Sequence, residues 1–355
     1  MFTRRHCLVQ GLALAAPSLT HALPARTLRF PRDHGSHPDL RTEWWYITGH
    51  AQAAGRLWGF QVTFFRSRVD AAQGLQSAFA AKQLLFAHAA VTDVQGQRLR
   101  HGQRIARAGF GVAQASEDDT RVRLQDWTLE RAQSATGSRY TAQVEGDDFS
   151  LGLRFDSTQP LLLQGQQGLS RKGPLEQQAS YYYSQPQLAV SGTITVQGQR
   201  MAVTTGRAWM DHEWSEALMH PEAQGWDWIG MNLHDGSALT AFRLRRADGS
   251  AVWAGGSLRA PGQAATIFEA SALAFKPERW WTSPHSGARY PVQWQVQTPA
   301  GSLGVRALVD DQELNSSAST GTIYWEGLSD LHDSAGRAVG RGYLEMTGYA
   351  KPLRL

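Results

Sequence analysis

The sequence contains a single cysteine among its 355 residues, Cys7, and this residue lies in an N-terminal segment that we expect to be removed. The mature chain would then carry no thiol. Disulfides, thiolate nucleophiles and zinc or iron–sulfur sites built on cysteine are therefore excluded as sources of its stability or chemistry.

Long apolar runs and concentrated positive charge are also lacking. Beyond the N-terminal segment, no apolar run reaches the roughly 18 residues that a membrane-spanning helix needs. The formal charge of +4 comes from 35 basic and 31 acidic residues, which are scattered along the chain rather than gathered into a stripe. We therefore expect neither a membrane span nor a nucleic-acid partner.

Motifs for metal-dependent or serine hydrolysis are missing as well. Residue types that bind zinc are present, but no His-Glu-x-x-His or His-x-His spacing joins them on one face: His34, His37, His212 and Glu213. No Gly-x-Ser-x-Gly motif marks a serine nucleophile. The sequence predicts no metal and no cofactor.

The N-terminal segment has the features of an export signal. Arg4 and Arg5 precede a mildly apolar run over residues 8–19, and small residues follow near Ala22 and Ala25. This order is typical of a twin-arginine signal peptide; an ordinary secretory signal or a short helix is the alternative. We expect residues 1–25 to be removed and the product to be periplasmic or secreted.

The most frequent pattern in the chain is two-residue alternation of apolar and polar side chains. Five segments show it, with glycine-containing breaks nearby: residues 59–66, 121–124, 150–155, 192–196 and 239–245. Such alternation predicts strands, and many short strands predict an antiparallel sandwich or barrel. Helical periodicity is weak, and only residues 73–83 allow a short helix or, alternatively, a long covering loop.

A faint internal repeat predicts two similar units. An Asp-His pair, a His-Pro pair and a tryptophan-rich strand start follow one another from Asp33 to Gly55, and again from Asp211 to Gly236. One barrel would then follow another. We expect an N-terminal domain over residues 26–217 and a C-terminal domain over residues 218–355, with the junction near residues 216–225.

Several motifs carry a resemblance to a known family. They are Asp33–Gly35, Arg41–Tyr46, Tyr181–Ser184, Gly206–Trp214, Gly225–Trp228, Asp311–Leu314, Tyr324–Gly327 and Gly340–Glu345. In this order they resemble the AttH/carotenoid 1,2-hydratase (hydroxyneurosporene synthase) family, and especially its exported branch of predicted secreted hydrolases. The resemblance implies an all-β protein of two tandem lipocalin-like antiparallel β-barrel domains with little helix.

The resemblance also implies a chemistry. Relatives hydrate carotenoid double bonds, and more distant lipocalin-like enzymes guide the cyclisation of polyenes. The catalytic set of the hydratases includes a His-x-Trp arrangement, which His212 and Trp214 match. Asp227 is a candidate counterpart of the acid in that set, whose tyrosine has no unique match in this chain.

The motif around Asp211 suggests how such a reaction would work. In a strand, Asp211 and Glu213 face one side, whereas His212 and Trp214 face the other. A carboxyl buried among aromatic rings has a raised pKa and can protonate an alkene carbon. Tryptophan rings would then stabilise the carbocation, and His212 would hold the water that adds. The candidate catalytic residues are Asp211, His212, Trp214 and Asp227, and either aspartate can be the acid.

Aromatic residues of the same motifs are candidates for ligand binding where the two domains meet. They are Trp44, Trp45, Tyr182, Trp209, Trp226 and Trp228. We expect these rings to line an apolar cleft, and the side chains of Asp211 and His212 to reach into it.

The polar residues around these motifs also allow an architectural interpretation. Carboxylates and histidines at strand ends often bind backbone amides or pair with arginine across an interface, which fixes geometry without chemistry. We assign a supporting or structural role to Asp33, His34, Arg41, Glu43, Arg207 and Glu213.

Two classes of function follow. The first is a cofactor-free hydratase, isomerase or cyclase that acts on a long apolar polyene or isoprenoid-like molecule; the second is a non-catalytic periplasmic carrier of such a ligand. An acid in a closed pocket favours the enzyme, whereas an acid paired with arginine at a wet surface favours the carrier. The sequence leaves the identity of the ligand and the oligomeric state open.

Overall fold

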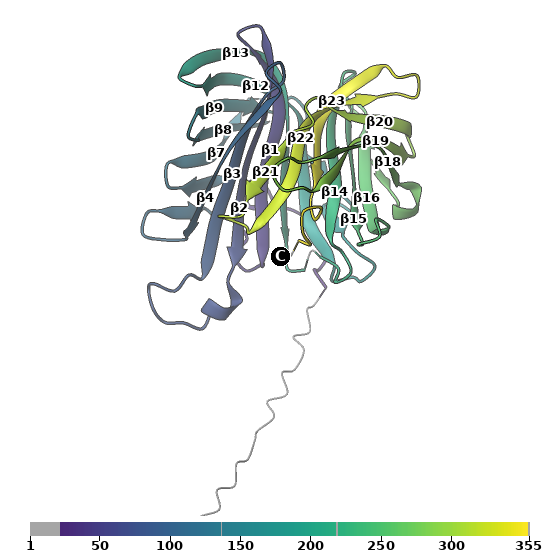
Figure 1. The fold of residues 1–355 in the computed structure, drawn as a ribbon. Coiled ribbons are helices and arrows are strands. Elements are labelled where there is room, and N and C mark those ends of the chain that lie inside the picture. Colours follow the sequence, from purple (N-terminus) through teal and green to yellow (C-terminus); the bar gives the residue numbers. More distant parts are fainter. Residues whose placement is uncertain (1–21, 136, 218, 354–355) are drawn as a thin grey trace, which may run out of the picture.

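The computed structural model describes residues 22–135, 137–217 and 219–353, so most of the expected signal segment lies outside the described residues. Within these ranges the chain forms two large antiparallel sheets, each curled around a hydrophobic core of its own (Figure 1). This architecture confirms the expected all-β class.

Sheet A takes its strands from residues 42–215. They are β1 (Thr42–Ala53), β2 (Arg56–Arg68), β3 (Gln83–Asp93), β4 (Arg98–Arg107), β5 (Ala113–Ala115), β6 (Arg121–Leu124), β7 (Trp127–Ser134), β8 (Gly137–Glu145), β9 (Phe149–Asp156), β10 (Leu162–Leu163), β11 (Leu169–Arg171), β12 (Ala179–Val196) and β13 (Gln199–Ser215). Their order is β4-β3-β2-β1-β13-β12-β9-β8-β7-β6-β5, and β10 and β11 pair with β12. Strands β3 and β4 approach β6, so that the sheet nearly closes into a barrel.

Sheet B takes its strands from residues 225–346. They are β14 (Gly225–Leu233), β15 (Ala238–Arg245), β16 (Ala251–Arg259), β17 (Thr266–Phe268), β18 (Ala274–Thr282), β19 (Arg289–Thr298), β20 (Gly301–Ala307), β21 (Glu313–Ser316), β22 (Thr322–His332) and β23 (Ala338–Met346). Their order is β17-β16-β15-β14-β23-β22-β20-β19-β18, and β21 pairs with β22. The predicted boundary between residues 217 and 218 falls between the two sets of strands and stays a prediction.

All five segments predicted from alternation are strands, and they lie in β2, β6, β9, β12 and β15. On peripheral strands such as β6, burial alternates as expected for a sheet with one wet face. Strand β15, by contrast, is buried at every position, although its sequence includes Thr240, Arg243 and Arg245. Both faces of the central strands are buried because the two sheets pack against each other.

Helical structure in the described residues is confined to short 3-10 turns: η1 (Arg32–His34), η2 (Asp70–Ala72) and η3 (Ala270–Ala272). Residues 73–82 form turns and extended chain after η2, so the loop alternative holds for this segment and the helix alternative does not. No helix in the described ranges has both the length and the apolar character needed to cross a membrane.

The sheets meet through the faces that point away from their two cores. A separate apolar cluster fills this junction, with members on both sheets: Tyr46, Leu162, Trp209, Ala223, Trp228, Ala238, Phe242, Leu244, Leu328 and Tyr343. Strand β1 approaches β23, β2 approaches β22, and β13 approaches β14 (Figure 1). Side chains on the outward faces of these strands are therefore enclosed between two sheets.

Candidate functional site

Strand β13 carries the motif that the sequence singled out, and its two faces point into different environments. Asp211 and Glu213 face sheet B across the junction, whereas His212 and Trp214 face the core of sheet A. The cause is the strand geometry, because successive side chains point to opposite faces. The structure therefore does not bring Asp211 and His212 to one cleft, which corrects the expectation that both reach the junction.

Asp211 is buried at the junction among neutral hydrogen-bond donors. The hydroxyl of Tyr182 donates to Oδ2 at 2.7 Å, and Ser184 Oγ and Trp209 Nε1 donate to Oδ1 at 2.6 and 2.7 Å. No lysine or arginine of the described chain forms an ion pair with this carboxyl. Burial raises the pKa of Asp211 to about 7, although the three hydrogen bonds partly oppose this effect. A substantial fraction of Asp211 therefore carries a proton at neutral pH.

Three of the predicted ligand-binding aromatics, Tyr182, Trp209 and Trp228, surround this carboxyl together with Tyr46, which was not predicted. Tyr46 and Trp228 meet edge to face across the two sheets with ring centroids 5.3 Å apart, and Trp209 lies 6.4 Å from Trp228. The indole of Trp228 also donates to the hydroxyl of Tyr182 at 3.3 Å. Trp44 and Trp226 pack against the same cluster and remain half-buried, so solvent reaches this part of the junction.

Sheet B places a second carboxyl at the matching position. Strand β1 pairs Tyr46 with Asp211, and β14 pairs Trp228 with Glu345; the two rings then touch across the junction. The side chain of Glu345 is partly exposed to solvent. The protein around its carboxyl nevertheless raises its pKa to about 8, first by excluding water and then through the nearby charges of Asp211 and Glu213. Each sheet thus contributes a carboxyl of raised pKa at this register, and Glu345 lies on β23, which the repeat in the sequence did not include.

Another junction carboxyl, Glu326 on β22, is buried beside Glu345. Burial and the neighbouring Glu345 raise its pKa well above the ordinary range. Gln61 Nε2 donates to its Oε2 at 2.7 Å. Its Oε1 and the hydroxyls of Tyr46 and Thr48 lie close to one another, but among the described residues none of the three meets strict hydrogen-bond geometry. Buried polar atoms of this kind are usually satisfied by water or a ligand, so this part of the junction is suited to hold either.

The raised pKa of Glu345 predicts a pH-dependent stability. Because its folded pKa of about 8 lies above the ordinary 4.5, its contribution to stability is present at low pH and is lost as the pH rises through about 8. Glu345→Gln removes this ionisation. The melting temperature of the variant minus that of the wild type should therefore be larger at pH 9 than at pH 5.5. An equal difference at both pH values in a thermal scan would contradict the assignment.

Glu43, at the start of β1, is the centre of a separate buried cluster inside sheet A. Its Oε1 accepts hydrogen bonds from His37 Nδ1 at 2.7 Å and His212 Nε2 at 3.0 Å, and its Oε2 accepts one from Arg66 Nε at 2.8 Å. Burial alone would raise the pKa of Glu43, but the hydrogen bonds from His212 and His37 hold it well below the ordinary value. Glu43 is therefore a buried carboxylate anion, paired with Arg66.

The N-terminal motif reaches the same cluster. Asp33 accepts from His37 Nε2 at 3.0 Å, and the hydroxyl of Tyr183 lies 2.7 Å from His34 Nδ1 and 3.2 Å from His212 Nδ1. Burial lowers the pKa of His34 to about 2 and that of His212 to about 4, so both rings are neutral at pH 7. The two copies of the repeat thus meet, but inside sheet A and not at the junction.

His37, Glu43 and His212 each offer one ligand atom, and these atoms lie within 4.8 Å of one another. Sequence spacing does not predict this group, because Glu43 on β1 and His212 on β13 are far apart in the chain and meet only through the pairing of these two strands. Each of these atoms is already engaged in a hydrogen bond, and the guanidinium of Arg66 holds the other carboxylate oxygen. A metal cation would have to compete with that positive charge, so the group fits an ion-pair network better than a metal centre.

Two tryptophans stack on the histidines of this cluster. The ring of Trp214 lies 4.0 Å from that of His37 and nearly parallel to it, and Trp45 stacks on His212 at 4.7 Å. Trp45 also donates to the backbone oxygen of His34 at 3.0 Å. Trp45 therefore belongs to the core of sheet A, and the expectation that it lines the junction beside Trp44 is corrected.

Asp227 lies on the core side of sheet B, away from Asp211. Arg243 Nε donates to Oδ2 at 2.7 Å and the Tyr349 hydroxyl donates to Oδ1 at 2.8 Å; Arg245 Nε lies 3.6 Å away. Two arginines and a tyrosine therefore surround this carboxyl. The arrangement of Asp227 is thus architectural, and Asp211 is the better placed of the two candidate acids.

The remaining predicted supports have mixed positions. Arg66 binds Glu43, and Arg41 is exposed ahead of β1. Arg207 is exposed on β13 and donates to the backbone oxygen of Gly206. Glu213 does form an ion pair at the junction, with Lys172 at 2.9 Å.

Four residues of these clusters were missed by sequence reasoning: Arg66, Lys172, Glu326 and Glu345. Glu326 and Glu345 lie in motifs that carried the family resemblance, so a signal existed although it gave no role. Arg66 is the last residue of an alternating segment, and a charged side chain at such a position is usually exposed to solvent. Lys172 lies between turns, and its ammonium over the rings of Phe242 and Tyr182 depends on long-range packing.

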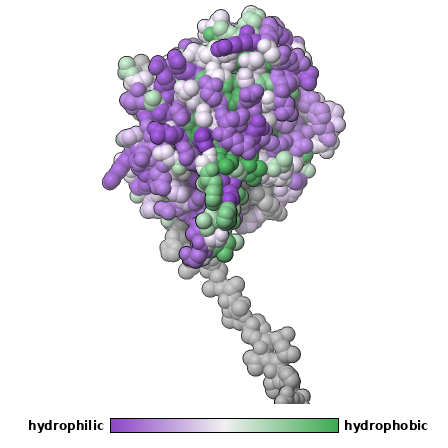
Figure 2. Space-filling view, turned by 90° about the vertical axis from the view of Figure 1, so that its left-hand side faces the viewer, coloured by the Kyte–Doolittle hydropathy of each residue, from purple (hydrophilic) through white to green (hydrophobic). Residues whose placement is uncertain are grey.

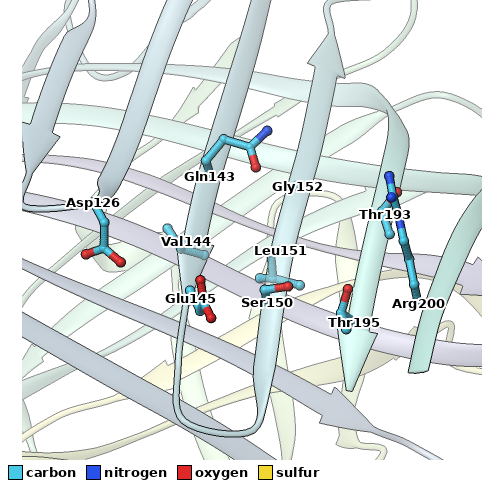
Figure 3. Close-up of a pocket in the computed structure, with 10 residues that line it drawn as sticks. All are labelled: Asp126, Gln143, Val144, Glu145, Ser150, Leu151, Gly152, Thr193, Thr195 and Arg200. Carbon is cyan, nitrogen blue, oxygen red and sulfur yellow. The ribbon is translucent and has the colours of Figure 1, made fainter. Parts of the chain in front are cut away.

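A shallow polar pocket lies elsewhere, on the outer side of sheet A near the β8–β9 turn (Figure 3). It is lined by Asp126, Gln143, Val144, Glu145, Ser150, Leu151, Gly152, Thr193, Thr195 and Arg200. None of the predicted site residues lines it, and its polar surface is not suited to a long apolar ligand.

Comparison with known proteins places this architecture in a family. The AttH-like family matches residues 21–349. A crystal structure from Nitrosomonas europaea, provisionally assigned to AttH, is 45% identical, with a TM-score of 0.85 over 92% of this chain and 99% of the other. Kievitone hydratase from Nectria haematococca shares the fold at 13% identity, with a TM-score of 0.70 over 92% of this chain and 94% of the other. CghA, solved with Sch210972, does so at 16% identity and a TM-score of 0.53 over 88% of each chain.

A search among curated protein sequences gave no match. The similarity to kievitone hydratase and CghA is a similarity of fold, because their sequences have diverged so far. The family match and the Nitrosomonas structure, by contrast, cover nearly all of the described chain. The chain belongs to the AttH-like family.

Proposed function

We propose that this protein binds a long apolar, polyene or isoprenoid-like molecule where sheets A and B meet, and hydrates or isomerises one of its double bonds without a cofactor. The observation that carries the proposal is Asp211, a buried carboxyl with a pKa of about 7 and no ion-pair partner in the described chain. Groups of this kind, enclosed by aromatic rings, are typical general acids.

In a hydration, Asp211 alone can donate the proton that the alkene needs and accept the proton that the added water loses. The carboxylic acid gives its proton to one alkene carbon, and the π electrons form the new C–H bond and leave a carbocation at the other carbon. A water molecule adds through its oxygen and then loses one proton to the Asp211 carboxylate. The net change is the addition of one water, and the acid is regenerated.

The surroundings of Asp211 suit both charge states of this cycle. The donors Tyr182, Ser184 and Trp209 stabilise the carboxylate once the proton has left. The rings of Trp209 and Trp228 offer π faces to a cation. His212 cannot hold the water, since it lies on the other face of β13; the buried polar atoms of Tyr46, Thr48 and Glu326 are better placed for that role.

The relatives support this proposal at the level of reaction class. One protein of the same fold is a kievitone hydratase, and another, CghA, was solved with the compound Sch210972. We carry over only the idea that this fold hosts water addition and binds organic ligands.

A carrier function is the second candidate. The three hydrogen bonds to Asp211 tie β12 to β13, and a carboxyl held in this way can serve architecture alone. A carrier would use the same aromatic junction and leave its ligand unchanged.

Isotope incorporation separates the two candidates. The protein is incubated with a panel of acyclic polyenes in detergent, in deuterium oxide or in oxygen-18 water. Hydration predicts a product heavier by one water, which carries one carbon-bound deuterium in deuterium oxide and one oxygen-18 atom in oxygen-18 water. Isomerisation predicts carbon-bound deuterium in deuterium oxide and no oxygen-18. Mass spectrometry of the extracted lipids makes the measurement. Bound but unlabelled polyene in every case would leave only the carrier.

We also propose that the protein acts in the periplasm or outside the cell, on the basis of its N-terminal sequence. Expression with that N-terminus, followed by fractionation and intact-mass measurement, tests this directly. A processed chain that lacks about the first 25 residues is expected in the periplasm or medium. Lipids or pigments that copurify with this form would identify the ligand.

A further inference from the structure

Two neighbouring loops at one end of sheet A expose large apolar side chains. Phe79, in the β2–β3 loop, is 71% exposed, and Phe110, after β4, is 61% exposed. Their rings stack on each other with centroids 5.4 Å apart. Leu75 and Val112 are exposed in the same two loops. We call these four residues the loop patch.

The loop patch is bordered by positive charge. The guanidinium of Arg107 lies 4.2 Å from the ring of Phe110 and 5.4 Å from that of Phe79. Lys82 is exposed at the end of one loop, and Arg123 lies beside the other at Gly111. In residues 69–83 and 105–114 the one acidic residue is Asp70, which pairs with Arg68 at 2.7 Å.

The shape of this region is better suited to contact with a deformable, extended surface than to insertion into a groove on another protein. The β2–β3 loop projects beyond the end of the sheet (Figure 1), and Figure 2 shows hydrophobic surface gathered toward the same end of the molecule. Exposed aromatics on projecting loops can enter the interfacial layer of a bilayer, while flanking cations bind lipid phosphates. We propose that the loop patch docks this protein on the surface of an anionic lipid bilayer.

Such docking is peripheral, because side chains and not a spanning segment enter the lipid. It would also bring the protein to the phase in which long apolar molecules dissolve. The proposal does not rest on the chemistry of Asp211, since vesicle binding is measured without any substrate. Failure of one proposal therefore leaves the other intact.

Vesicle cosedimentation tests the docking with the full chain. Vesicles of phosphatidylcholine with about 30% phosphatidylglycerol should bind the wild type, and added salt or pure phosphatidylcholine should weaken the binding. Combined Phe79→Ser and Phe110→Ser should lower the partition coefficient about tenfold or more, because two exposed rings no longer enter the interface. Trp280→Ser is the matched control, since Trp280 is also exposed and also contacts an arginine, but lies on sheet B.

Two further variants keep the test decisive if the double variant folds poorly by circular dichroism. Phe79→Trp should strengthen binding, because tryptophan prefers the membrane interface, and Arg107→Gln should weaken binding to anionic vesicles alone. Wild-type protein that stays in solution, or variants that bind like wild type, would overturn the proposal. Equal binding to neutral vesicles would overturn the anionic assignment. Self-association that the double variant abolishes, without vesicle binding, would assign the patch to a second copy of the chain instead.

Discussion

Replacement of Asp211 by asparagine is expected to lower turnover about 100-fold or more and to leave ligand affinity nearly unchanged. Asparagine has almost the same shape and can still accept the hydrogen bonds of Ser184 and Trp209. It cannot, however, give a proton to a carbon. Product formation and ligand binding are measured on the same preparation, the latter by quenching of the junction tryptophans.

The pH profile adds an independent check on Asp211. Its acid form is the active one, and its pKa is about 7, so the rate should be constant at low pH and fall as the pH rises through about 7. Asp118→Asn, at an exposed turn, is the control and should match wild type. Full turnover in Asp211→Asn would transfer the acid role elsewhere, and Glu345 would be the first residue to examine.

Replacement of Glu43 by alanine is expected to lower the free energy of unfolding by about 3–5 kcal/mol, because it leaves the buried guanidinium of Arg66 without its counter-charge. Two buried histidines also lose the acceptor of one ring nitrogen. Urea unfolding followed by fluorescence gives the measurement. Glu222→Ala, which removes an exposed ion pair with Arg246, is the control and should change stability little.

A double variant separates charge from packing at Glu43. If the loss comes from the unpaired Arg66, then Arg66→Met added to Glu43→Gln should recover part of the stability. If the two changes are simply additive, the coupling that we assign to this pair is absent. Acid should also destabilise the wild type: the folded pKa of His212, about 4, lies below the ordinary 6.5, so its contribution is lost as the pH falls through that range.

Strand periodicity was the most informative feature of the sequence. Alternation located strands correctly because a side chain on a strand has only two directions, and a one-sided core requires one of them to be apolar. The same rule separates Asp211 and Glu213 from His212 and Trp214, because alternate residues of a strand share a face. Applied to Trp44 and Trp45, the rule puts the two rings on opposite faces, which is why only Trp44 packs at the junction and Trp45 lies in the core of sheet A.

The polar clusters were harder to predict, because their members are close only in space. Glu43 meets His212 through the pairing of β1 with β13, and Glu345 matches Asp211 through two separate sheets. A carboxylate such as Asp227 looks the same in sequence whether it faces an arginine or an alkene. Only its neighbours in the fold, Arg243 and Tyr349, decide between these environments.

By itself the sequence determined the all-β class, the family and the face of the strand on which each residue of the Asp211 motif lies, since each follows from local alternation or from short contiguous motifs. Only the packing of the two sheets establishes what each face meets: Asp211 meets an aromatic junction, and His212 meets a buried ion-pair network. The reason is physical, because burial and the charges nearby set the state of a titratable group, and both depend on strands that are distant in the chain.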